Sequence, residues 1–282
     1  MAGRLADKVA VVIGGGQTPG DTIGNGRATA VLFAREGARV FVVDRRLAAA
    51  EETVAQIRDE GGTAWAVERD ATREPDCAAL FARCVDEQGR VDVLHNNVGI
   101  GGGDAGPAHV DLEAWDQILH VNLKSVIVPC KHVLPVMRRQ GGGAIVNVSS
   151  IAAVCATPIV AYKASKAGVN AYTQSLAVGN AKHGIRANVI MPGLMNTPMA
   201  IEGIAAATGV DKAKLIALRD AQVPLGGRMG TAWDVAYAAL FLASDEARFI
   251  TGVALAVWTA GRARGSASPA RRPPPRTRRA PP

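Results

Sequence analysis

The sequence predicts an α/β protein with a single doubly wound parallel sheet that is flanked by helices on both faces. Short apolar runs alternate with longer segments of helical spacing along the first 261 of the 282 residues. The apolar runs are continuous, as in parallel strands that are buried on both faces of a sheet. No second domain or internal repeat interrupts the alternation, so we expect residues 1–261 to form one domain.

Seven apolar runs are expected to form strands, and helical segments connect them. The strands are predicted at residues 8–13, 39–43, 63–68, 91–95, 144–148, 185–191 and 253–257. The clearest helical segments are residues 27–35, 47–59, 76–87, 115–139 and 162–183. In a sheet of this kind, ligands bind beyond the carboxyl ends of the strands, where the winding reverses. The residues that follow each strand are therefore the first candidates for a functional site.

The composition is that of a globular protein, with 48% hydrophobic and 20% charged residues. The four cysteines form no CxxC pair and no cluster with histidine, so no metal site is expected. Scattered thiols fit a reduced cytoplasm. No apolar run approaches the roughly 20 residues that a membrane-spanning helix needs, and the first eight residues lack the apolar core of a signal peptide. We therefore expect a cytoplasmic protein without a membrane partner.

The net charge of +7 comes from the end of the chain. Residues 262–282 contain seven arginines, six prolines and no acidic residue, which leaves 25 basic and 25 acidic side chains in the first 261 residues. A segment of this composition cannot form a packed element and is expected to be disordered. Because the body is neutral, no specific nucleic-acid partner is expected.

A glycine cluster follows the first predicted strand. Three glycines at positions 14–16, and two more at 24 and 26, precede a helix that opens at Arg27. Glycines let backbone N–H groups approach a pyrophosphate, and a helix N-terminus favours its negative charge. The second strand ends at Asp44, where a carboxylate can bind the adenosine ribose hydroxyls and would repel a 2′-phosphate. This argument favours NAD over NADP, although Arg45 and Arg46 offset part of the repulsion; the alternative role of Asp44 is a helix cap.

Two serines, a tyrosine and a lysine define a second candidate centre. Ser149 and Ser150 end the fifth predicted strand, and Tyr162 and Lys166 follow on a helix. Residues four positions apart share one helix face, so the phenol and the ammonium can point into the same crevice. The ammonium favours phenolate and lowers the pKa of the tyrosine from about 10, which makes it a proton donor and acceptor. Tyr-x-x-x-Lys alone is common, and the serines upstream make it specific.

Further motifs accompany these two centres along the chain. In order, the set is the glycine loop before Arg27, Asp44, Asp70, Asn96-Asn97-Val98-Gly99, Asn122, Ser149-Ser150, Tyr162-Lys163-Ala164-Ser165-Lys166, Pro192-Gly193 and Thr197. With this set, the sequence from the first strand to about Val257 resembles the short-chain dehydrogenase/reductase family. The resemblance implies a Rossmann-type fold, a nicotinamide cofactor, and hydride transfer at a C–OH or C=O group. It also implies a homo-oligomer, either a dimer or a tetramer.

The resemblance implies a role for each catalytic residue. Tyr162 would exchange a proton with the substrate oxygen, and Lys166 would lower its pKa and bind the nicotinamide ribose. Ser150 would hold the substrate oxygen; Ser149 is the alternative, since it lies at a distance before the tyrosine that is frequent in the family. Asn122 would anchor the backbone and water chain that relays the proton, and its alternative role is at a helix bend.

The same resemblance implies a cofactor site along the edge of the sheet. Asp70 would meet the adenine, and Thr197 would touch the nicotinamide end unless it only caps a helix. Asn97 and Gly99 would line the cleft, with a turn as the alternative role of Asn97. The implied cofactor residues are Gly14, Gly24, Gly26, Asp44, Asp70, Asn97, Gly99, Tyr162, Lys166, Pro192, Gly193 and Thr197.

The glycine loop departs from the family pattern because it carries extra residues within 17–23, among them Pro19 and Asp21. The insertion either folds as a surface turn over the pyrophosphate or loosens phosphate binding. A carboxylate such as that of Asp21 is unfavourable near a pyrophosphate unless it points to solvent.

The end of the chain also departs from the pattern, since Val257-Trp258-Thr259-Ala260-Gly261 stands where the family commonly has Val-Asp-Gly-Gly. If the reading frame is shifted to start at the third base of the Val257 codon, the last base of the Trp258 codon and the first two of the Thr259 codon must encode aspartate. The codons around it then permit Val-Asp-Gly-Gly. We hypothesise that residues 258–282 are translated from a shifted reading frame of a GC-rich gene. The shift would come from a mutation or from a sequencing error, and resequencing the coding DNA tests the hypothesis. Such an end would perturb a subunit interface.

Residues 195–225 lie where the family places its substrate lid. Their Ala, Ile, Leu and Val content with scattered charges predicts an amphipathic helical cover. The predicted function is NAD-linked hydride transfer with a moderately hydrophobic secondary alcohol or ketone. The alternatives are an NADPH-dependent 3-oxoacyl carrier-protein reductase, which would want a basic patch, and a non-catalytic dinucleotide-binding protein. A nucleic-acid-binding role for the arginine-rich tail is a third hypothesis.

Overall fold

Seven strands form one parallel sheet in the computed structural model, which describes residues 3–259. The spatial order is β3-β2-β1-β4-β5-β6-β7, so the winding reverses between β1 and β4. All the pairings are parallel. The strands are β1 (Val9–Ile13), β2 (Arg39–Asp44), β3 (Thr63–Glu68), β4 (Val93–Asn96), β5 (Gly143–Val148), β6 (Ile185–Pro192) and β7 (Ala254–Val257). The predicted fold class is confirmed.

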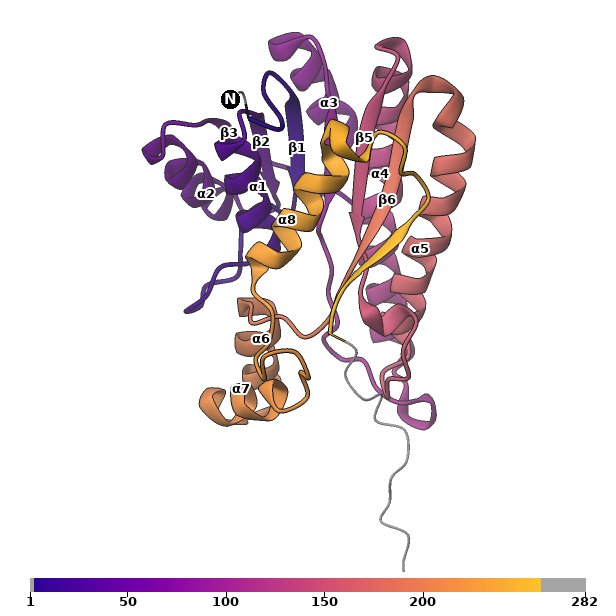
Figure 1. Cartoon of the computed structure of the whole chain (residues 1–282). Helices are drawn as coiled ribbons and strands as arrows, with labels where there is room; N and C mark the ends of the chain where they lie inside the picture. The colour runs from indigo at the N-terminus through magenta and orange to yellow at the C-terminus, as the bar shows by residue number, and fades with distance from the viewer. Residues whose placement is uncertain (1–2, 260–282) are drawn as a thin grey trace, which may run out of the picture.

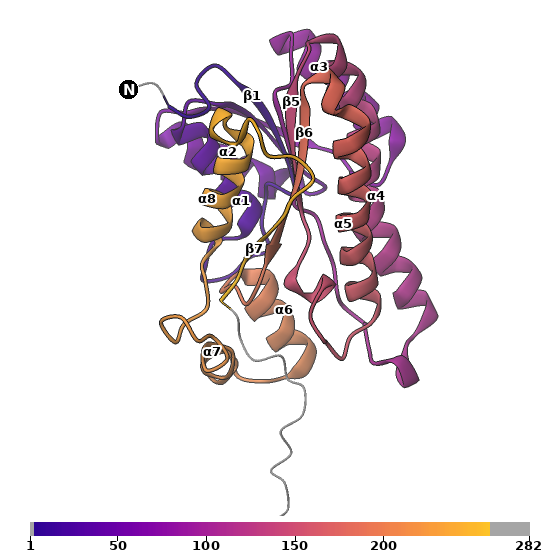
Figure 2. The same cartoon turned by 45° about the vertical axis from the view of Figure 1, so that its right-hand side comes forward.

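Helices cover both faces of the sheet, as Figures 1 and 2 show. One layer contains α1 (Asn25–Arg35), α2 (Leu47–Asp59) and α8 (Ala232–Ala243). The other layer contains α3 (Glu74–Gln88), α4 (Leu112–Arg139) and α5 (Ala161–Asn180). The central strand shows why the sequence is apolar without alternation: Val9, Val11 and Ile13 pack under α3, α4 and α5, whereas Ala10 and Val12 pack under α1 and α8.

Two further helices, α6 (Pro198–Thr208) and α7 (Lys212–Asp220), lie beyond the carboxyl ends of the strands, at the bottom of Figure 1. They share a small core of their own, made of Ile201, Leu215, Val223 and Met229. The helical cover expected within residues 195–225 is thus present as a helix pair. We call α6 and α7 the cover.

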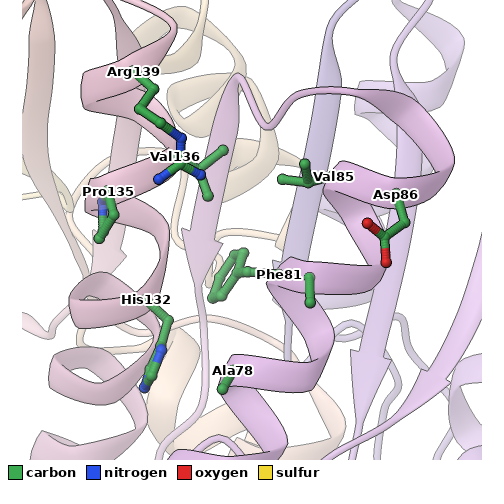
Figure 3. A pocket seen from close by; sticks show the side chains of 9 residues that line it. Ala78, Phe81, Val85, Asp86, His132, Pro135, Val136 and Arg139 are labelled. Carbon is green, nitrogen blue, oxygen red and sulfur yellow. The ribbon is translucent and has the colours of Figure 1, made fainter.

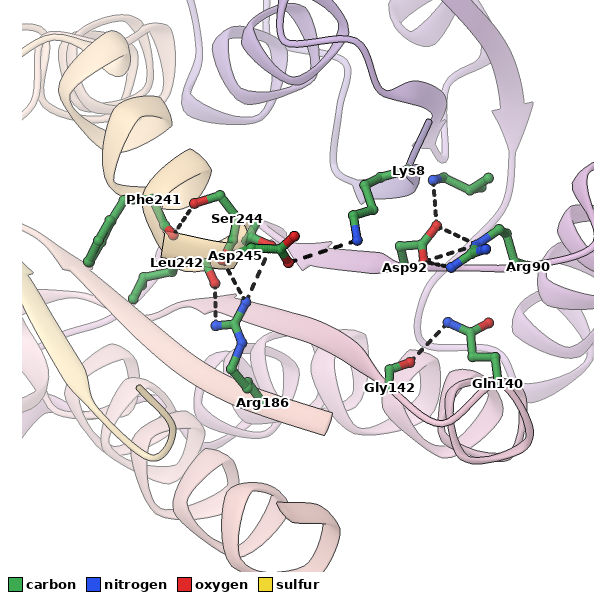
Figure 4. Close-up of polar contacts among 12 residues, drawn as sticks. Lys8, Arg90, Asp92, Gln140, Gly142, Arg186, Phe241, Leu242, Ser244 and Asp245 are labelled. Carbon is green, nitrogen blue, oxygen red and sulfur yellow. Dashed lines mark hydrogen bonds and ion pairs between the residues drawn. The ribbon is translucent and has the colours of Figure 1, made fainter. Parts of the chain in front are cut away.

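The opposite edge of the sheet is held together by side chains that bond backbone groups (Figure 4). Asp92 accepts a hydrogen bond from the Val9 N–H at 2.8 Å and pairs with the guanidinium of Arg90. Arg186 donates to the Leu242 carbonyl at 2.6 Å, at the end of α8. These polar groups serve the fold, and the candidate site lies at the other edge.

The predicted bounds agree with the observed ones to within three residues, and the differences have local causes. α3 begins at Glu74, because Pro75 fits the first turn of a helix. α5 ends at Asn180, and a 3₁₀ turn leads to Gly184, whose φ of 71° ends the helical segment. Among residues 3–259, no helix is both long enough and apolar enough to cross a membrane. The arginine-rich tail lies outside the described residues.

Candidate active site

Tyr162 and Lys166 lie one turn apart near the N-terminal end of α5, at the carboxyl edge of the sheet. The Lys166 side chain is buried, with 2% of the residue exposed. Its Nζ lies 5.8 Å from the centroid of the Tyr162 ring and donates a hydrogen bond to the Val148 carbonyl at 3.0 Å. The helical spacing of the two residues therefore does bring the ammonium beside the phenol.

The two serines after β5 point to different partners. Ser149 is buried, and its hydroxyl donates to the Lys166 carbonyl at 2.8 Å, which holds α5 against the end of β5. Ser150 accepts from the Ala152 N–H at 3.1 Å, and its hydroxyl lies beside the Tyr162 phenol. Of the two, Ser150 is the serine that can share a substrate oxygen with Tyr162.

Burial dominates the electrostatics of this centre. It lowers the pKa of Lys166 to about 8. It also raises the pKa of Tyr162, and the hydrogen bond with Ser150 lowers that pKa only in part. The direction for Tyr162 is opposite to the one expected from a neighbouring ammonium, because desolvation of the phenolate outweighs the other contributions. The phenol is therefore a proton donor in this state of the protein.

Asn122 holds the loop after β4 from the buried face of α4. Its Oδ1 accepts from the Ile100 N–H at 2.7 Å, and its Nδ2 donates to the Ile100 carbonyl at 2.9 Å. The same Nδ2 donates to the Ser165 hydroxyl at 3.0 Å, and that hydroxyl donates to the Tyr162 carbonyl at 2.8 Å. The side chain thus connects the loop after β4 to α5.

Two residues of the site were missed by the sequence analysis, Asp104 and Ser165. Asp104 lies in a glycine-rich loop, yet its carboxylate accepts hydrogen bonds from the first N–H groups of α5. The only available signal was an acidic residue among glycines after the fourth strand. Ser165 lies within the Tyr-to-Lys motif itself, and only the fold reveals its link to Asn122.

The glycines after β1 bring the first turn of α1 against the strand. A Cβ on Gly26 would lie 1.9 Å from the Gly14 carbonyl oxygen and 2.7 Å from Nδ2 of Asn97, and Gly14 has a φ of 73°. Asn97 in turn donates to the Gly14 carbonyl at 3.2 Å. The N-cap residue of α1, Gly24, has no side chain with which to cap the helix. A helix N-terminus of this kind, beside bare backbone, fits a pyrophosphate group.

Asp44 ends β2 next to this glycine cluster. Its Oδ1 accepts from the Arg46 N–H at 3.1 Å, and a Cβ on Gly16 would come within 2.7 Å of its Oδ2. The Arg46 guanidinium bonds the Gln17 carbonyl at 2.7 Å. Arg45 is exposed, and within the described residues no hydrogen bond or ion pair joins it to Asp44. A carboxylate with one open oxygen beside a glycine suits the two hydroxyls of a ribose.

The inserted loop, residues 17–23, leaves the glycine cluster and reaches the cover. Gln17 closes its base, since its Oε1 accepts from the Gly24 N–H at 2.9 Å. Asp21 is exposed, and its Oδ2 lies 3.5 Å from Nζ of Lys212 in α7. Lys212 also pairs with Glu202 of α6. The insertion therefore forms an exposed turn whose carboxylate pairs with the cover, and its effect on phosphate binding stays a prediction.

The remaining predicted residues follow the ends of β3, β4 and β6. Asp70 lies after β3, where one of its oxygens accepts from the Thr72 N–H at 2.8 Å. Gly99 lies against Lys166, whose Nζ would be 3.0 Å from a Cβ at this position. Thr197 is 6% exposed and begins α6 without a side-chain capping bond.

Pro192 and Gly193 end β6, next to the C-terminal end of β7. The Gly193 N–H donates to the Val257 carbonyl at 3.0 Å, and a Cβ on Gly193 would lie 2.2 Å from Cδ1 of Trp258. Trp258 therefore packs closely against the glycine at the edge that carries the candidate site. Residues 260–282, and with them most of the hypothesised shifted frame, fall outside the described part of the chain.

A separate groove lies between α3 and α4, away from these residues (Figure 3). Phe81 and Val85 line it from α3, and His132 and Pro135 line it from α4. It shares no residue with the candidate active site. Within residues 3–259, no group of three or more His, Cys, Asp or Glu residues is placed to hold a metal ion.

Comparisons with known proteins agree with this fold. A family model described as enoyl-(acyl carrier protein) reductase matches residues 21–258. The chain is 39% identical over 258 residues to cis-4-hydroxycyclohexanecarboxylate dehydrogenase of Sinomonas cyclohexanicum, covering 91% of this chain and 97% of the relative. It is 36% identical over 261 residues to cyclopentanol dehydrogenase of Comamonas sp., covering 90% and 97%. A solved structure described as a short-chain dehydrogenase/reductase from Burkholderia xenovorans superposes with a TM-score of 0.85 at 44% identity, covering 91% and 97%.

Proposed function

Because this chain belongs to the short-chain dehydrogenase/reductase family, and is an oxidoreductase of that family, we propose that it oxidises a moderately hydrophobic cyclic secondary alcohol with NAD. The observation that carries the proposal is the meeting of Ser150, Tyr162 and Lys166 at the carboxyl edge, beside a glycine-rich helix N-terminus. We also expect, from the sequence, that the protein is cytoplasmic and forms a homo-oligomer.

The residues that would hold the cofactor extend from β3 to β6. The first turn of α1 would face the pyrophosphate, and Asp44 would bind the adenosine ribose. Lys166, which stays charged below its pKa of about 8, would bind the nicotinamide ribose. When bound, the nicotinamide supplies the acceptor for the hydride of the alcohol carbon.

The chain's own residues would handle the proton. Ser150 would hold the substrate hydroxyl, and Tyr162 would take its proton as the phenolate. Forming that phenolate needs a compensating positive charge, because burial raises the pKa of the phenol. Lys166 is the buried cation beside it, and its own position is fixed by the Val148 carbonyl. Asn122 would hold the backbone of Ile100 in place beside this centre.

The substrate class is inferred from the cover and from the relatives. The cover presents a small apolar core in which Ile201 and Leu215 are buried, and Met195 lies nearby in the main core. The two curated relatives above are named for alcohols on saturated five- and six-membered rings. The substrates named for these relatives are therefore our ground for choosing a ring alcohol over an acyl chain on a carrier protein.

The test is NADH formation, followed by absorbance, when the purified full chain receives NAD and a panel of secondary alcohols. We expect turnover with cyclopentanol, cyclohexanol and 4-hydroxycyclohexanecarboxylate, and slower turnover with NADP. Turnover confined to NADPH and an acyl thioester would replace the proposal with the carrier-protein reductase. Cofactor binding without turnover of any alcohol would favour a dinucleotide-binding protein that has lost catalysis.

A further inference from the structure

One carboxylate, that of Asp104, binds the whole N-terminus of the catalytic helix. Its Oδ1 accepts from the Val160 N–H at 3.2 Å and from the Ala161 N–H at 3.0 Å. Its Oδ2 accepts from the N–H of Tyr162 itself at 2.7 Å. The Ala105 N–H completes the set, with 2.9 Å to Oδ1. Three backbone donors at the start of α5, and a fourth from the loop of Asp104 itself, thus converge on one side chain.

This arrangement replaces an ordinary helix cap. The residue at the N-cap of α5 is Val160, whose side chain has no hydrogen-bond acceptor. The first N–H groups of a helix need acceptors from outside the helix. A negative charge at that end is favoured by the helix dipole, and hydrogen bonds to an ionised group are the stronger ones. The helix that carries Tyr162 therefore depends on the loop after β4 for its first turn.

The same loop touches Tyr162 in two further ways. A Cβ on Gly101 would lie 3.3 Å from Cδ2 of the phenol ring, so the loop packs against the ring. Asn122 fixes Ile100 in that loop and is joined through Ser165 to the Tyr162 carbonyl. The bond from the Tyr162 N–H to Asp104 completes a closed chain of contacts through the loop, Asn122 and Ser165, which we call the circuit. The backbone of Tyr162 is thus held from both sides, and its ring is packed by the loop between.

We propose that Asp104 is a positioning residue that fixes the Tyr162 phenol against Ser150. The inference rests on the proposed function and goes beyond it, because it assigns a role to a residue that does not touch the reacting atoms. Both carboxylate oxygens are needed to accept these hydrogen bonds, because the Tyr162 N–H donates to Oδ2 and the other three N–H groups donate to Oδ1. An asparagine has the same shape but a single acceptor oxygen, so Asp104→Asn must leave one side of the circuit open.

The matched control is Asp111, which caps α4 through one bond from the Ala114 N–H at 2.9 Å. Asp111→Asn removes the same negative charge from a helix cap on an exposed residue outside the circuit. If Asp104 only stabilised a helix end, the two variants would lose similar thermal stability and keep their turnover.

The first measurement is kcat and KM of both variants with NAD and a cyclic alcohol that the wild type oxidises. The second is a pH titration of the Tyr162 phenol by ultraviolet absorbance, in which the signal of the Tyr162→Phe variant is subtracted to remove the other tyrosines. We expect Asp104→Asn to lower kcat about tenfold or more, because a misplaced catalytic group loses orientation. KM for NAD should change less than twofold. The phenol should titrate closer to its ordinary value, because the loosened ring loses the burial that raises its pKa.

Equal kcat and an equal phenol midpoint in Asp104→Asn and wild type would overturn the inference. The titration also decides the case without turnover. If the wild type oxidises no alcohol, a shifted midpoint in Asp104→Asn alone still supports the positioning of Tyr162, while the proposed function fails. An unshifted midpoint then rejects both.

Discussion

Asp21 of the inserted loop and Lys212 of the cover form an ion pair, with 3.5 Å between Oδ2 and Nζ. The pair joins the glycine cluster after β1 to the helices that close the carboxyl edge. Lys212 also pairs with Glu202, whose side chain is only 17% exposed. One ammonium thus neutralises two carboxylates at the contact between loop and cover.

Replacing Lys212 by alanine should loosen this contact and leave the fold intact. Exposed ion pairs stabilise a protein by roughly 0–1 kcal/mol, so the change in the free energy of unfolding should be small. The two carboxylates left together repel one another, and the inserted loop should then open more often. We expect NADH to dissociate several-fold faster in Lys212→Ala, measured by stopped-flow fluorescence. Lys214→Ala, an exposed lysine on the same helix, is the control, and an equal rate in both variants would contradict the prediction.

Replacing Asp44 by alanine should change the choice of cofactor. The open carboxylate oxygen beside Gly16 would bind the ribose hydroxyls of NAD and repel the 2′-phosphate of NADP. We expect Asp44→Ala to weaken NADH binding about tenfold or more and to leave NADPH binding equal or improved, measured by calorimetry. Asp59→Ala, at the exposed end of α2, removes the same charge away from the cluster. Parallel losses for both cofactors in Asp44→Ala would mean that the carboxylate only supports the fold.

His95 should make the protein sensitive to acid. The ring is fully buried in β4 against Phe33, and neither nitrogen has a hydrogen-bond partner within residues 3–259. Burial lowers its pKa to about 3. Between this value and the ordinary value near 6.5, the unfolded chain binds a proton that the folded chain does not. The free energy of unfolding therefore falls as pH falls through this window, by about 2 kcal/mol at pH 5.

A His95→Leu variant tests this dependence by chemical denaturation at pH 7.5 and pH 5. The variant should lose about 2 kcal/mol less stability than the wild type between the two pH values. His120→Leu, at an exposed position, should behave as the wild type does. Identical pH dependence in His95→Leu and wild type would show that other groups control the acid response.

The sequence predicted the fold because each strand of the sheet is buried on both faces. A run such as residues 9–13 has one interpretation once helical segments flank it, and the order of motifs then identified the family, which the comparisons confirm. The meeting of Tyr162 and Lys166 also followed from local helix geometry. The roles of these site residues remain proposals.

What the sequence could not predict are contacts between distant segments. Nothing local indicates that Asp104 caps α5, because the partners are joined only by the fold. The ion pair of Asp21 with Lys212 has the same origin. The expected direction for the Tyr162 pKa was wrong for this state of the protein, because an i, i+4 spacing predicts a neighbouring charge but not the extent of burial.

The central claim is that Tyr162 transfers the proton during alcohol oxidation, and the most direct measurement is the turnover of Tyr162→Phe with NAD and cyclohexanol. Removing the hydroxyl takes away the proton acceptor and leaves the ring that packs under Gly101. We expect kcat to fall about 10²- to 10⁴-fold, while the dissociation constant for NADH stays within twofold of the wild type. A Tyr162→Phe variant that binds NADH normally and keeps full turnover would contradict the account.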